Sequence, residues 1–345
     1  MNTSILLVCL MLLLHLEGHK LTSKENEERI ETCGKGLKLK PNYGRKILNG
    51  DMVRIDNAPW NVAIEIKGKE VGLCSGTLIS KRHILTARHC FAHLMEAGYY
   101  SVGTNQPLGG CASRNNDSLV VEGHHIKMHR VYSGVDCGFR KYCPKEGFAA
   151  SHIEKVILPK VCDDKQLDFD DFAIVELSEN LKFSRKVQAV CVTNNDSNLF
   201  DDAAQMKLYG FGLNPSDERR LIGRLRSETV KSRKCMTTTK KSFCIKSIAA
   251  NQLACAGDSG GGVVTMTDDR VTVVGVIFEG VKCETSTVNE QDYVSNVAYY
   301  SEDICKYTGI CSRQEPVNRD TKLSTVMNIK IPFFFYFLVL LYIMQ

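Results

Sequence analysis

The sequence lacks internal repeats, low-complexity stretches and any dense block of basic residues. Its net charge is only +5, from 44 Lys and Arg against 39 Asp and Glu, and these charges are spread along the chain. A nucleic-acid-binding protein needs a concentrated basic surface, so the composition argues against that class. With 43% hydrophobic and 24% charged residues, the 345-residue chain is suited to one large or two small folded domains.

Neither end of the chain has an apolar run of about 20 residues, the length that a membrane-spanning helix needs. The run 5–14 predicts a secretory signal peptide over residues 1–18, although basic residues are missing before it. A membrane helix is the alternative, for which the run is too short. The run 331–344, in the tail 308–345, favours membrane association and leaves open whether it is a short span or a lipid-anchor signal.

The cysteines show no CxxC spacing, which argues against a zinc site. One of the 15 cysteines lies in the predicted signal peptide, and the remaining even number predicts disulfides formed in an oxidising compartment. The glycosylation sequons at Asn116 and Asn195 are compatible with secretion. We expect no metal and no cofactor.

Short runs rich in β-branched and aromatic residues alternate with turn residues, which predicts an all-β fold of antiparallel barrels or sandwiches. The runs are WNVAIEI, GTLIS, HILTA, AIVEL, QMKLYGFG, GGVVTM and RVTVVGVIF. One helix is predicted over Val297–Tyr307, and 179–200 is interpreted as the connection between two halves.

Residues 109–164 are interpreted as an insertion, because they show little regular periodicity. The segment contains His124, His125 and His129, which suggest either a metal site or solvent-facing loop residues. The loop interpretation is favoured.

The stretch CAGDSGGGVV, residues 255–264, places a serine between an acid and three glycines. A polar turn is the ordinary explanation, but GDSGG arises by chance in a chain of this length only about once in ten thousand. A serine nucleophile needs a base and an acid that orients the base. His89 follows an apolar run in HILTARHCF, and Asp171 begins a strand-like run in DFDDFAIVEL.

These three motifs, in the order His89, Asp171, Ser259, resemble those of the trypsin/chymotrypsin-like serine proteases. TARHC stands where the family has TAAHC, DFAI where it has D-[IL]-A-L, and GDSGGG where it has GDSGGP. The order excludes a lipase-like esterase of the α/β-hydrolase fold. The resemblance covers about residues 33 to 307.

The resemblance implies two six-stranded antiparallel β-barrels and a short C-terminal helix, in a peptidase domain over residues 47–307. The barrels would be 47–185 and 186–300. Ser259 would attack the substrate, His89 would transfer the proton, and Asp171 would orient the imidazole. The backbone N–H groups of Gly257 and Ser259 would form the oxyanion hole.

The resemblance also implies a zymogen with a propeptide over residues 19–46. In RKILNG, cleavage after Lys46 would free the ammonium group of Ile47, which would pair with Asp258. A buried carboxylate without a partner costs several kcal/mol by order of magnitude, so this pairing would order the oxyanion loop.

Four disulfides follow from the resemblance, and a further family bridge is missing because its two positions fall near Met206 and Thr265, neither of which is a cysteine. The implied pairs are Cys74–Cys90, Cys33–Cys191, Cys235–Cys244 and Cys255–Cys283. Four cysteines in the interpreted insertion are expected to pair among themselves: Cys111, Cys137, Cys143 and Cys162. Cys305 and Cys311 remain near the end.

The chain departs from the family pattern where Phe278-Glu279-Gly280 replaces Ser-Trp-Gly. Phe278 cannot donate to the catalytic Asp as the family serine does. These changes leave a second hypothesis, a catalytically impaired homologue that acts as a binding module.

Three residues are expected to line the substrate pocket: Leu253, Gly280 and Asp292. Leu253 at the floor predicts an apolar preference, worth about 2 kcal/mol of burial. If Asp292 reaches the pocket, the preference reverses to Arg and Lys. The expected partners are polypeptide substrates, an activating protease and protein inhibitors, in a secreted or extracellular setting.

Overall fold

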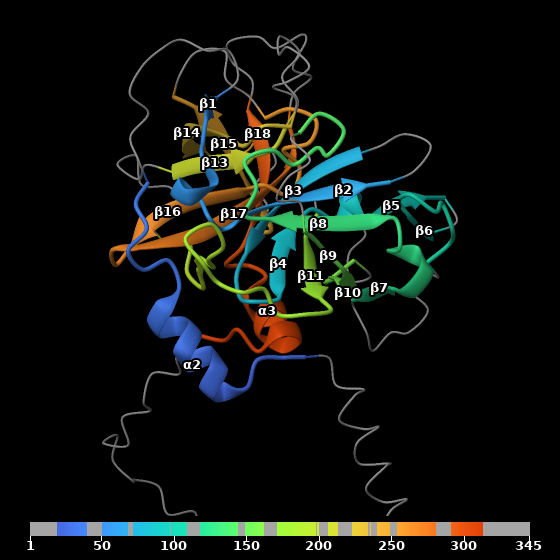
Figure 1. Ribbon diagram of the computed structural model, residues 1–345, viewed down its shortest axis with the longest axis horizontal. Coiled ribbons are helices and arrows are strands. Elements are labelled where there is room, and N and C mark those ends of the chain that lie inside the picture. The colour runs from blue at the N-terminus through green and yellow to red at the C-terminus, as the bar shows by residue number, and fades with distance from the viewer. Residues whose placement is uncertain are drawn as a thin grey trace, which may run out of the picture. The chain divides into compact units, whose positions relative to one another are not determined.

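The computed structural model describes most of the chain between residues 19 and 312. The described residues are 19–39, 50–67, 72–96, 98–108, 118–143, 149–161, 171–197, 199, 206–212, 223–233, 235, 240–248, 254–280 and 291–312. They form two large β-sheets, one two-stranded sheet and two α-helices, so the predicted all-β double-barrel fold is confirmed (Figure 1).

The first sheet is a curled half-barrel of eight antiparallel strands in the order β7-β10-β11-β4-β3-β2-β8-β9 (Figure 1). Its strands are β2 (Asn61–Ile66), β3 (Gly72–Leu78), β4 (His83–Thr86), β7 (Leu119–Glu122), β8 (His129–Ser133), β9 (Ala150–Ser151), β10 (Ile153–Leu158) and β11 (Ala173–Leu177). A separate hairpin consists of β5 (Ala92–Met95) and β6 (Gly98–Ser101). Isoleucine, leucine and valine dominate the central strands, in keeping with burial on both faces.

The second sheet closes into a six-stranded barrel in the order β14-β13-β16-β17-β18-β15, because β14 also pairs with β15. Its strands are β13 (Met206–Gly210), β14 (Arg226–Arg233), β15 (Ser242–Ser247), β16 (Gly262–Thr267), β17 (Arg270–Glu279) and β18 (Asp292–Asn296). Two short strands join it: β1 (Asp51–Met52) pairs with β14, and β12 (Cys191–Val192) runs parallel to β17.

One apolar core joins the two sheets. Trp60, which precedes β2, is fully buried and packs edge-on against Tyr209 of β13, with ring centroids 5.3 Å apart. Phe172, next to the predicted catalytic acid, stacks on Tyr300 at 4.2 Å. Burial of each large apolar side chain contributes about 1.5–3 kcal/mol, so these contacts hold the two halves in register.

The segment 109–164 is not an insertion where it is described. β7, β8 and β10 lie within it, and β10 pairs with β11 while β8 pairs with β2. The sequence interpretation failed because these strands are only four to six residues long and each contains at least one charged residue.

The two α-helices lie together at one end of the molecule (Figure 1). α3 (Ser301–Thr308) begins four residues later than predicted, because Asn296 Oδ1 accepts the N–H of Ala298 and holds a turn before it. α2 (Ser23–Thr32) was not predicted. A capping box begins it, in which Thr22 and Glu25 satisfy each other's backbone N–H groups.

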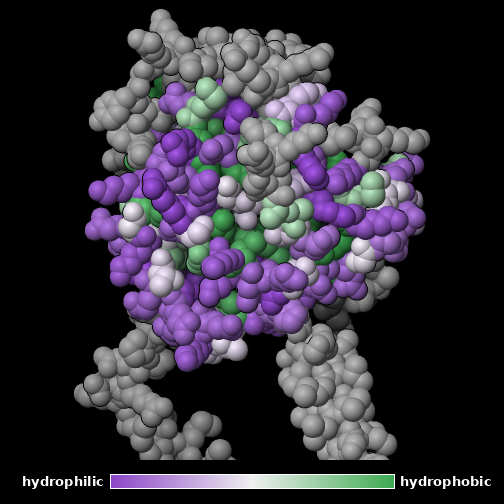
Figure 2. Space-filling view, viewed as in Figure 1, coloured by the Kyte–Doolittle hydropathy of each residue, from purple (hydrophilic) through white to green (hydrophobic). Residues whose placement is uncertain are grey.

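On the face seen in Figure 2, the described residues are mostly hydrophilic around the rim, and apolar residues gather near the centre. The large exposed apolar side chains of the described residues are Met52, Leu94, Met95, Val120, Phe183, Ile248 and Met266, which come from six separate strands or loops. No helix among the described residues is both long and apolar enough to cross a membrane. The tail run 331–344 lies outside the described residues.

Candidate active site

His89 and Asp171 are brought together at the end of two neighbouring strands. β4 and β11 pair side by side; His89 lies in a short 3-10 helix, η2 (Arg88–Cys90), just after β4, and Asp171 lies just before β11. His89 Nδ1 lies 2.6 Å from Asp171 Oδ2, and the His89 backbone N–H donates to Asp171 Oδ1 at 2.9 Å. The carboxylate therefore fixes both the position and the orientation of the imidazole.

Burial alone would lower the pKa of His89 and raise the pKa of Asp171, but each group stabilises the charged form of the other. The Asp171 carboxylate raises the pKa of His89 above its ordinary value, with Glu279 adding to the effect. The charge and hydrogen bonds of His89, helped by Arg88, hold the pKa of Asp171 below its usual range. Asp171 is thus ionised at neutral pH, beside a histidine that can accept a proton there.

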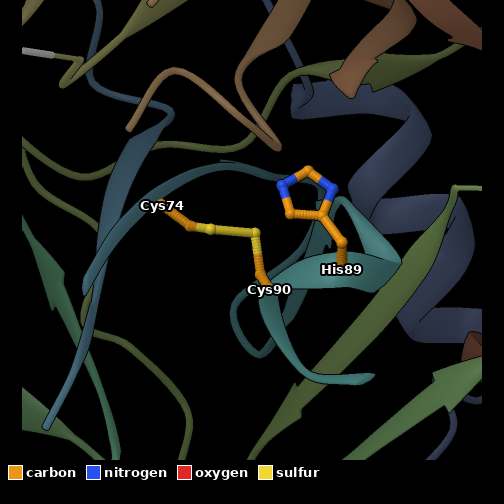
Figure 3. Close-up of side chains that lie close together, drawn as sticks. All are labelled: Cys74, His89 and Cys90. Atoms are coloured by element: carbon orange, nitrogen blue, oxygen red, sulfur yellow. A yellow bond between two sulfur atoms is a disulfide. The ribbon is translucent and has the colours of Figure 1, made fainter. Parts of the chain in front are cut away.

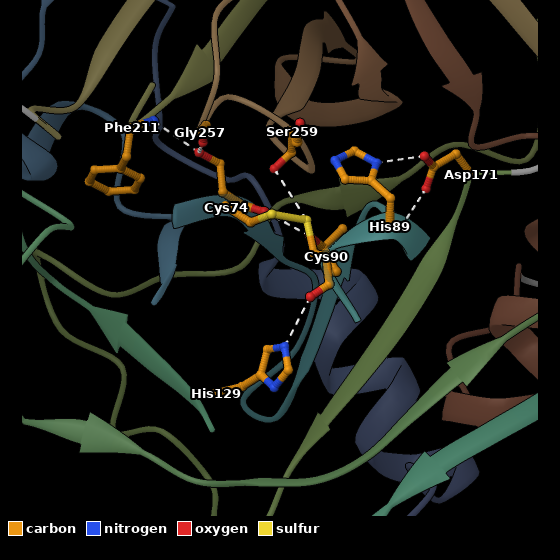
Figure 4. The surroundings of a disulfide bond; sticks show 10 residues. Cys74, His89, Cys90, His129, Asp171, Phe211, Gly257 and Ser259 are labelled. Carbon is orange, nitrogen blue, oxygen red and sulfur yellow. Dashed lines mark hydrogen bonds and ion pairs between the residues drawn. A yellow bond between two sulfur atoms is a disulfide. The ribbon is translucent and has the colours of Figure 1, made fainter. Parts of the chain in front are cut away.

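Ser259 lies on the side of the His89 ring away from Asp171 (Figure 4). Its backbone carbonyl accepts the N–H of Ser75 at 2.8 Å, and Gly260 N–H donates to Ile277 O at 2.7 Å. The loop is therefore fixed on both sides, against β3 and against β17.

The glycines around Ser259 are required by close packing. A Cβ on Gly260 would lie 2.1 Å from Thr86 Oγ1, and Gly260 has a φ of +86°. A Cβ on Gly262 would lie 2.2 Å from Thr77 Oγ1. This contact accounts for a glycine at 262, where the family motif has proline.

The Asp258 carboxylate points inward, against the end of β13. It accepts the N–H groups of Gly212 at 2.7 Å and Cys255 at 2.9 Å. A Cβ on Gly210 or Gly212 would lie 2.1 or 2.2 Å from its oxygens, so both positions must be glycine. Burial raises the pKa of Asp258 to about 6, although these N–H groups and the charge of Arg226 oppose the shift.

A family model described as the nematode trypsin-6-like family matches residues 3–311 of the chain. The chain belongs to this family. It is thereby a member of the trypsin/chymotrypsin-like family that the motifs predicted.

Similar curated proteins include tissue-type plasminogen activators. That of Rattus norvegicus is 28% identical over 277 residues, which are 73% of this chain and 43% of the relative. That of Sus scrofa is 28% identical over 295 residues, 78% of this chain and 46% of the relative. That of Homo sapiens is 27% identical over 278 residues, 73% of this chain and 43% of the relative. The chain thus spans less than half the length of these relatives.

Three of the four disulfides implied by the resemblance are present in this trypsin-6-like chain: Cys33–Cys191, Cys74–Cys90 and Cys235–Cys244. Cys255 is also disulfide-bonded, but Cys283 lies outside the described residues. Cys137 pairs with Cys143, and Cys305 pairs with Cys311. Cys111 and Cys162 lie outside the described residues.

One group of three potential metal ligands occurs in the described parts of the chain: Cys74, His89 and Cys90 (Figure 3). Because the two cysteines form a disulfide, neither offers a thiolate to a metal. The bridge instead fixes the loop that carries His89 to β3.

The three histidines proposed as a possible metal site, His124, His125 and His129, differ in environment. His129 is not the solvent-facing residue that the sequence suggested, because it is buried, stacks on Phe91 and contacts Cys90 O through Nε2 at 2.9 Å. His124 and His125 lie in a 3-10 helix, η3 (Gly123–His125), with their rings 3.8 Å apart.

The predicted specificity residues that are described lie together. Asp292, at the start of β18, is 1% exposed and accepts the N–H of Ala254 through Oδ2 at 3.2 Å. A Cβ on Gly280 would lie 3.0 Å from Asp292 Oδ1 and 2.7 Å from Ala254 O.

Of the other predicted site residues, four lie outside the described residues: Leu253, Lys46, Ile47 and Asn116. Asn195 is exposed, and its Oδ1 accepts the N–H of Ser197 at 2.8 Å.

Ser75 is a site residue that the motifs did not reveal. It is buried on β3; its hydroxyl donates to Gly257 O at 2.8 Å and accepts the N–H of Phe211 at 2.9 Å. Figure 4 shows Gly257 and Phe211 beside the Cys74–Cys90 bridge. Ser75 thereby joins β3 to the loop before Ser259 and to the segment after β13. In the sequence, only its position directly after Cys74, which forms the implied bridge to Cys90, could have indicated this role.

Proposed function

We propose that the chain is a secreted serine endopeptidase, made as a zymogen, that hydrolyses peptide bonds with His89, Asp171 and Ser259. The observation that carries the proposal is the pair of hydrogen bonds from His89 to Asp171, with Ser259 on the opposite side of the ring. An imidazole held in this way is suited to take a proton from a serine hydroxyl.

In this mechanism Ser259 Oγ attacks the carbonyl carbon of the peptide bond while His89 Nε2 accepts its proton. His89 then gives that proton to the departing amine, and a water molecule hydrolyses the acyl-enzyme by the same route. The N–H groups of Gly257 and Ser259 stabilise the oxyanion, a contribution of about 3–4 kcal/mol for each donor. Neither group donates to an acceptor within the described residues, which supports this role.

The proposed zymogen control acts through Asp258. Its raised pKa marks a carboxylate for which burial is costly, and an ammonium group freed at Ile47 would relieve that cost. Because Asp258 lies between Gly257 and Ser259 in sequence, its position and that of the oxyanion donors are coupled.

A catalytically impaired homologue is the second candidate, favoured by Phe278. Phe278 is buried, packs near Tyr293 and has no polar group to offer Asp171. However, both Asp171 carboxylate oxygens already bind His89, and Ser295 Oγ donates to the Asp171 backbone carbonyl at 3.0 Å. The histidine is therefore oriented without a donor at 278, which supports the enzyme.

We further propose that Asp292 gives a preference for Arg or Lys before the cleaved bond. Its carboxylate oxygen Oδ1 would lie 3.0 Å from a Cβ on Gly280, so a substrate side chain that passes Gly280 would come close to it. Burial raises the pKa of the neighbouring Glu228 well above its ordinary value, and the charge of Asp292 adds to the shift, so a cationic side chain would be stabilised beside Asp292. A positional-scanning peptide library on the activated chain, run beside Asp292→Asn, tests this. A persistent apolar preference in both would assign specificity to Leu253 instead.

Labelling with a fluorophosphonate, before and after cleavage at Lys46, tests the catalytic proposal. We expect labelling of the cut chain alone and none of Ser259→Ala in either form. Equal labelling of both forms would contradict the zymogen, and absence of labelling in the cut chain would favour the binding module. Ser178→Ala is the matched control, because Ser178 lies just after β11 and its hydroxyl bonds His152 O at the surface.

The five disulfides among the described residues are typical of proteins that mature in an oxidising compartment. We propose secretion, with membrane association through residues 331–344. The proposed partners are polypeptide substrates, an activating protease and protein inhibitors.

A further inference from the structure

Glu176 is a carboxylate in the middle of the first sheet that the proposed catalytic machinery does not use. It lies on β11 and is fully buried. Its cross-strand neighbours are His83 on β4 and Lys155 on β10. Lys155 Nζ lies 3.3 Å from Glu176 Oε2. Burial lowers the pKa of His83 to about 3, with Arg82 and Lys155 adding to the shift, so His83 is neutral.

The other oxygen of Glu176 contacts the first described residue of the chain. The backbone nitrogen of His19 donates to Glu176 Oε1 at 3.0 Å, across 157 positions of sequence. His19 directly follows the predicted signal peptide, residues 1–18. Signal cleavage would therefore make His19 the amino-terminal residue, and its backbone nitrogen already donates a hydrogen bond to the buried Glu176 carboxylate.

The chain after His19 is held closely enough to keep that nitrogen in place. Leu21 N–H donates to Thr308 O at 2.8 Å. A Cβ on Gly309 would lie 2.3 Å from Leu21 O, so Leu21 occupies a slot that Gly309 leaves open. Asn26 Nδ2 then donates to Cys311 O at 2.9 Å, which holds α2 on the end of α3.

We propose that His19 is the mature amino terminus and that its α-ammonium group binds Glu176, which is thus a docking site for the processed end of the chain. Signal cleavage adds water across the Gly18–His19 bond and leaves a carboxylate on Gly18 and an ammonium on His19. An amide donor thereby becomes a charged donor, which forms a stronger hydrogen bond to a carboxylate. Together with Cys33–Cys191, this contact holds both ends of the segment 19–33 on the folded body.

The first test is the amino-terminal sequence of the full chain secreted from cultured eukaryotic cells. We expect it to begin at His19, and a start at any other residue would overturn the proposal. The second test is the rate of acetylation of the α-amine by an N-hydroxysuccinimide ester at neutral pH, read by peptide mass spectrometry. A neighbouring carboxylate holds the amine protonated and unreactive, so we expect about tenfold slower acetylation than in Glu176→Gln. Glu154→Gln, an exposed acid on β10, should match the native rate.

A variant with one alanine added before His19 keeps Glu176 and the His19 N–H but moves the ammonium group by about 3.5 Å. This variant tests the effect of the ammonium charge without removing the Glu176 carboxylate from the folded chain. We expect its α-amine to react about as fast as that of Glu176→Gln. A rate equal to that of the native chain would show that Glu176 binds only an amide, and would overturn the proposal even if Glu176→Gln fails to fold.

Discussion

At the scale of single residues, the site depends on hydrogen bonds that local sequence does not reveal. In the sequence, Asp171 is only an acid at the start of a strand. In the structure, its carboxylate orients His89 because it accepts hydrogen bonds from both the ring N–H and the backbone N–H of that residue. Because the charge of Asp171 and its bond to the ring also raise the pKa of His89, they set the pH at which the proposed base is available.

Asp171→Asn should lower kcat by about 10⁴-fold, because the amide no longer holds the catalytic tautomer. Activity rises with pH as His89 loses its proton. Because Asp171 raises the pKa of His89, the acid limb of the kcat/KM profile of the native chain should have an apparent pKa above that of an ordinary histidine. Removing the carboxylate should move that limb to lower pH. A pH–rate profile measures this, and an unmoved limb would show that another group controls it.

Ser75→Ala should reduce the free energy of unfolding by about 1–3 kcal/mol, because Gly257 O and Phe211 N–H each lose their hydroxyl partner inside the protein. We also expect a lower kcat with KM little changed, since Gly257 carries one of the two proposed oxyanion donors. Denaturant unfolding and steady-state kinetics measure the two effects. Ser178→Ala should change neither, and a Ser75→Ala chain that matches it would refute the role.

At the scale of elements, the Ser259 loop packs directly on β3 and β4 with no side-chain layer between. Gly262→Ala should destabilise the fold by about 1–3 kcal/mol, since its new Cβ would overlap Thr77 Oγ1. Thr77→Ala removes that oxygen, so the double variant should recover part of the loss. Thermal unfolding of the native chain, the two single variants and the double variant measures the coupling energy between the two positions. If the two losses of stability simply add, the contact between residues 77 and 262 is contradicted.

The element scale also shows what could be predicted from sequence. The runs AIVEL and RVTVVGVIF were correctly predicted as strands and form β11 and most of β17. A strand buried on both faces is recognisable in sequence as a nearly continuous run of β-branched and other apolar residues. β7 and β10 were missed because charged residues interrupt runs of four to six residues. α2 was missed although its capping box is visible in the sequence, because SKENEERIET has no apolar stripe and is fixed by contacts with distant residues.

At the scale of the whole molecule, cleavage at Lys46 should leave the two pieces joined. Cys33 and Cys191 form a disulfide, so the proposed propeptide would stay covalently attached. Electrophoresis should give one band without reductant and two bands with it. Cys33→Ser together with Cys191→Ser should give two bands in both conditions; one non-reduced band from that variant would indicate another bridge.

Asp258 also makes stability depend on pH in the uncut chain. Its folded pKa, about 6, is above the ordinary aspartate value, so the folded state binds a proton more tightly than the unfolded state. Stability should therefore fall as the pH rises from about 4 to 6, by an amount on the order of 2 kcal/mol. Comparing Asp258→Asn with the native uncut chain across this range isolates the effect. Parallel profiles would show that Asp258 is not the group responsible.

The pairing of β1 with β14 has a consequence for the kinetics of activation. Gly50 O accepts a hydrogen bond from Arg226 at 3.2 Å, and Asp51 pairs with Ser227. A terminus freed at Ile47 would thus be attached to the barrel by only residues 47–49, a tether of about 10 Å at full extension. Its ammonium group would explore a very small volume, at an effective concentration on the order of millimolar or more. Capture by Asp258 would then be an intramolecular step, so its rate would be independent of protein concentration.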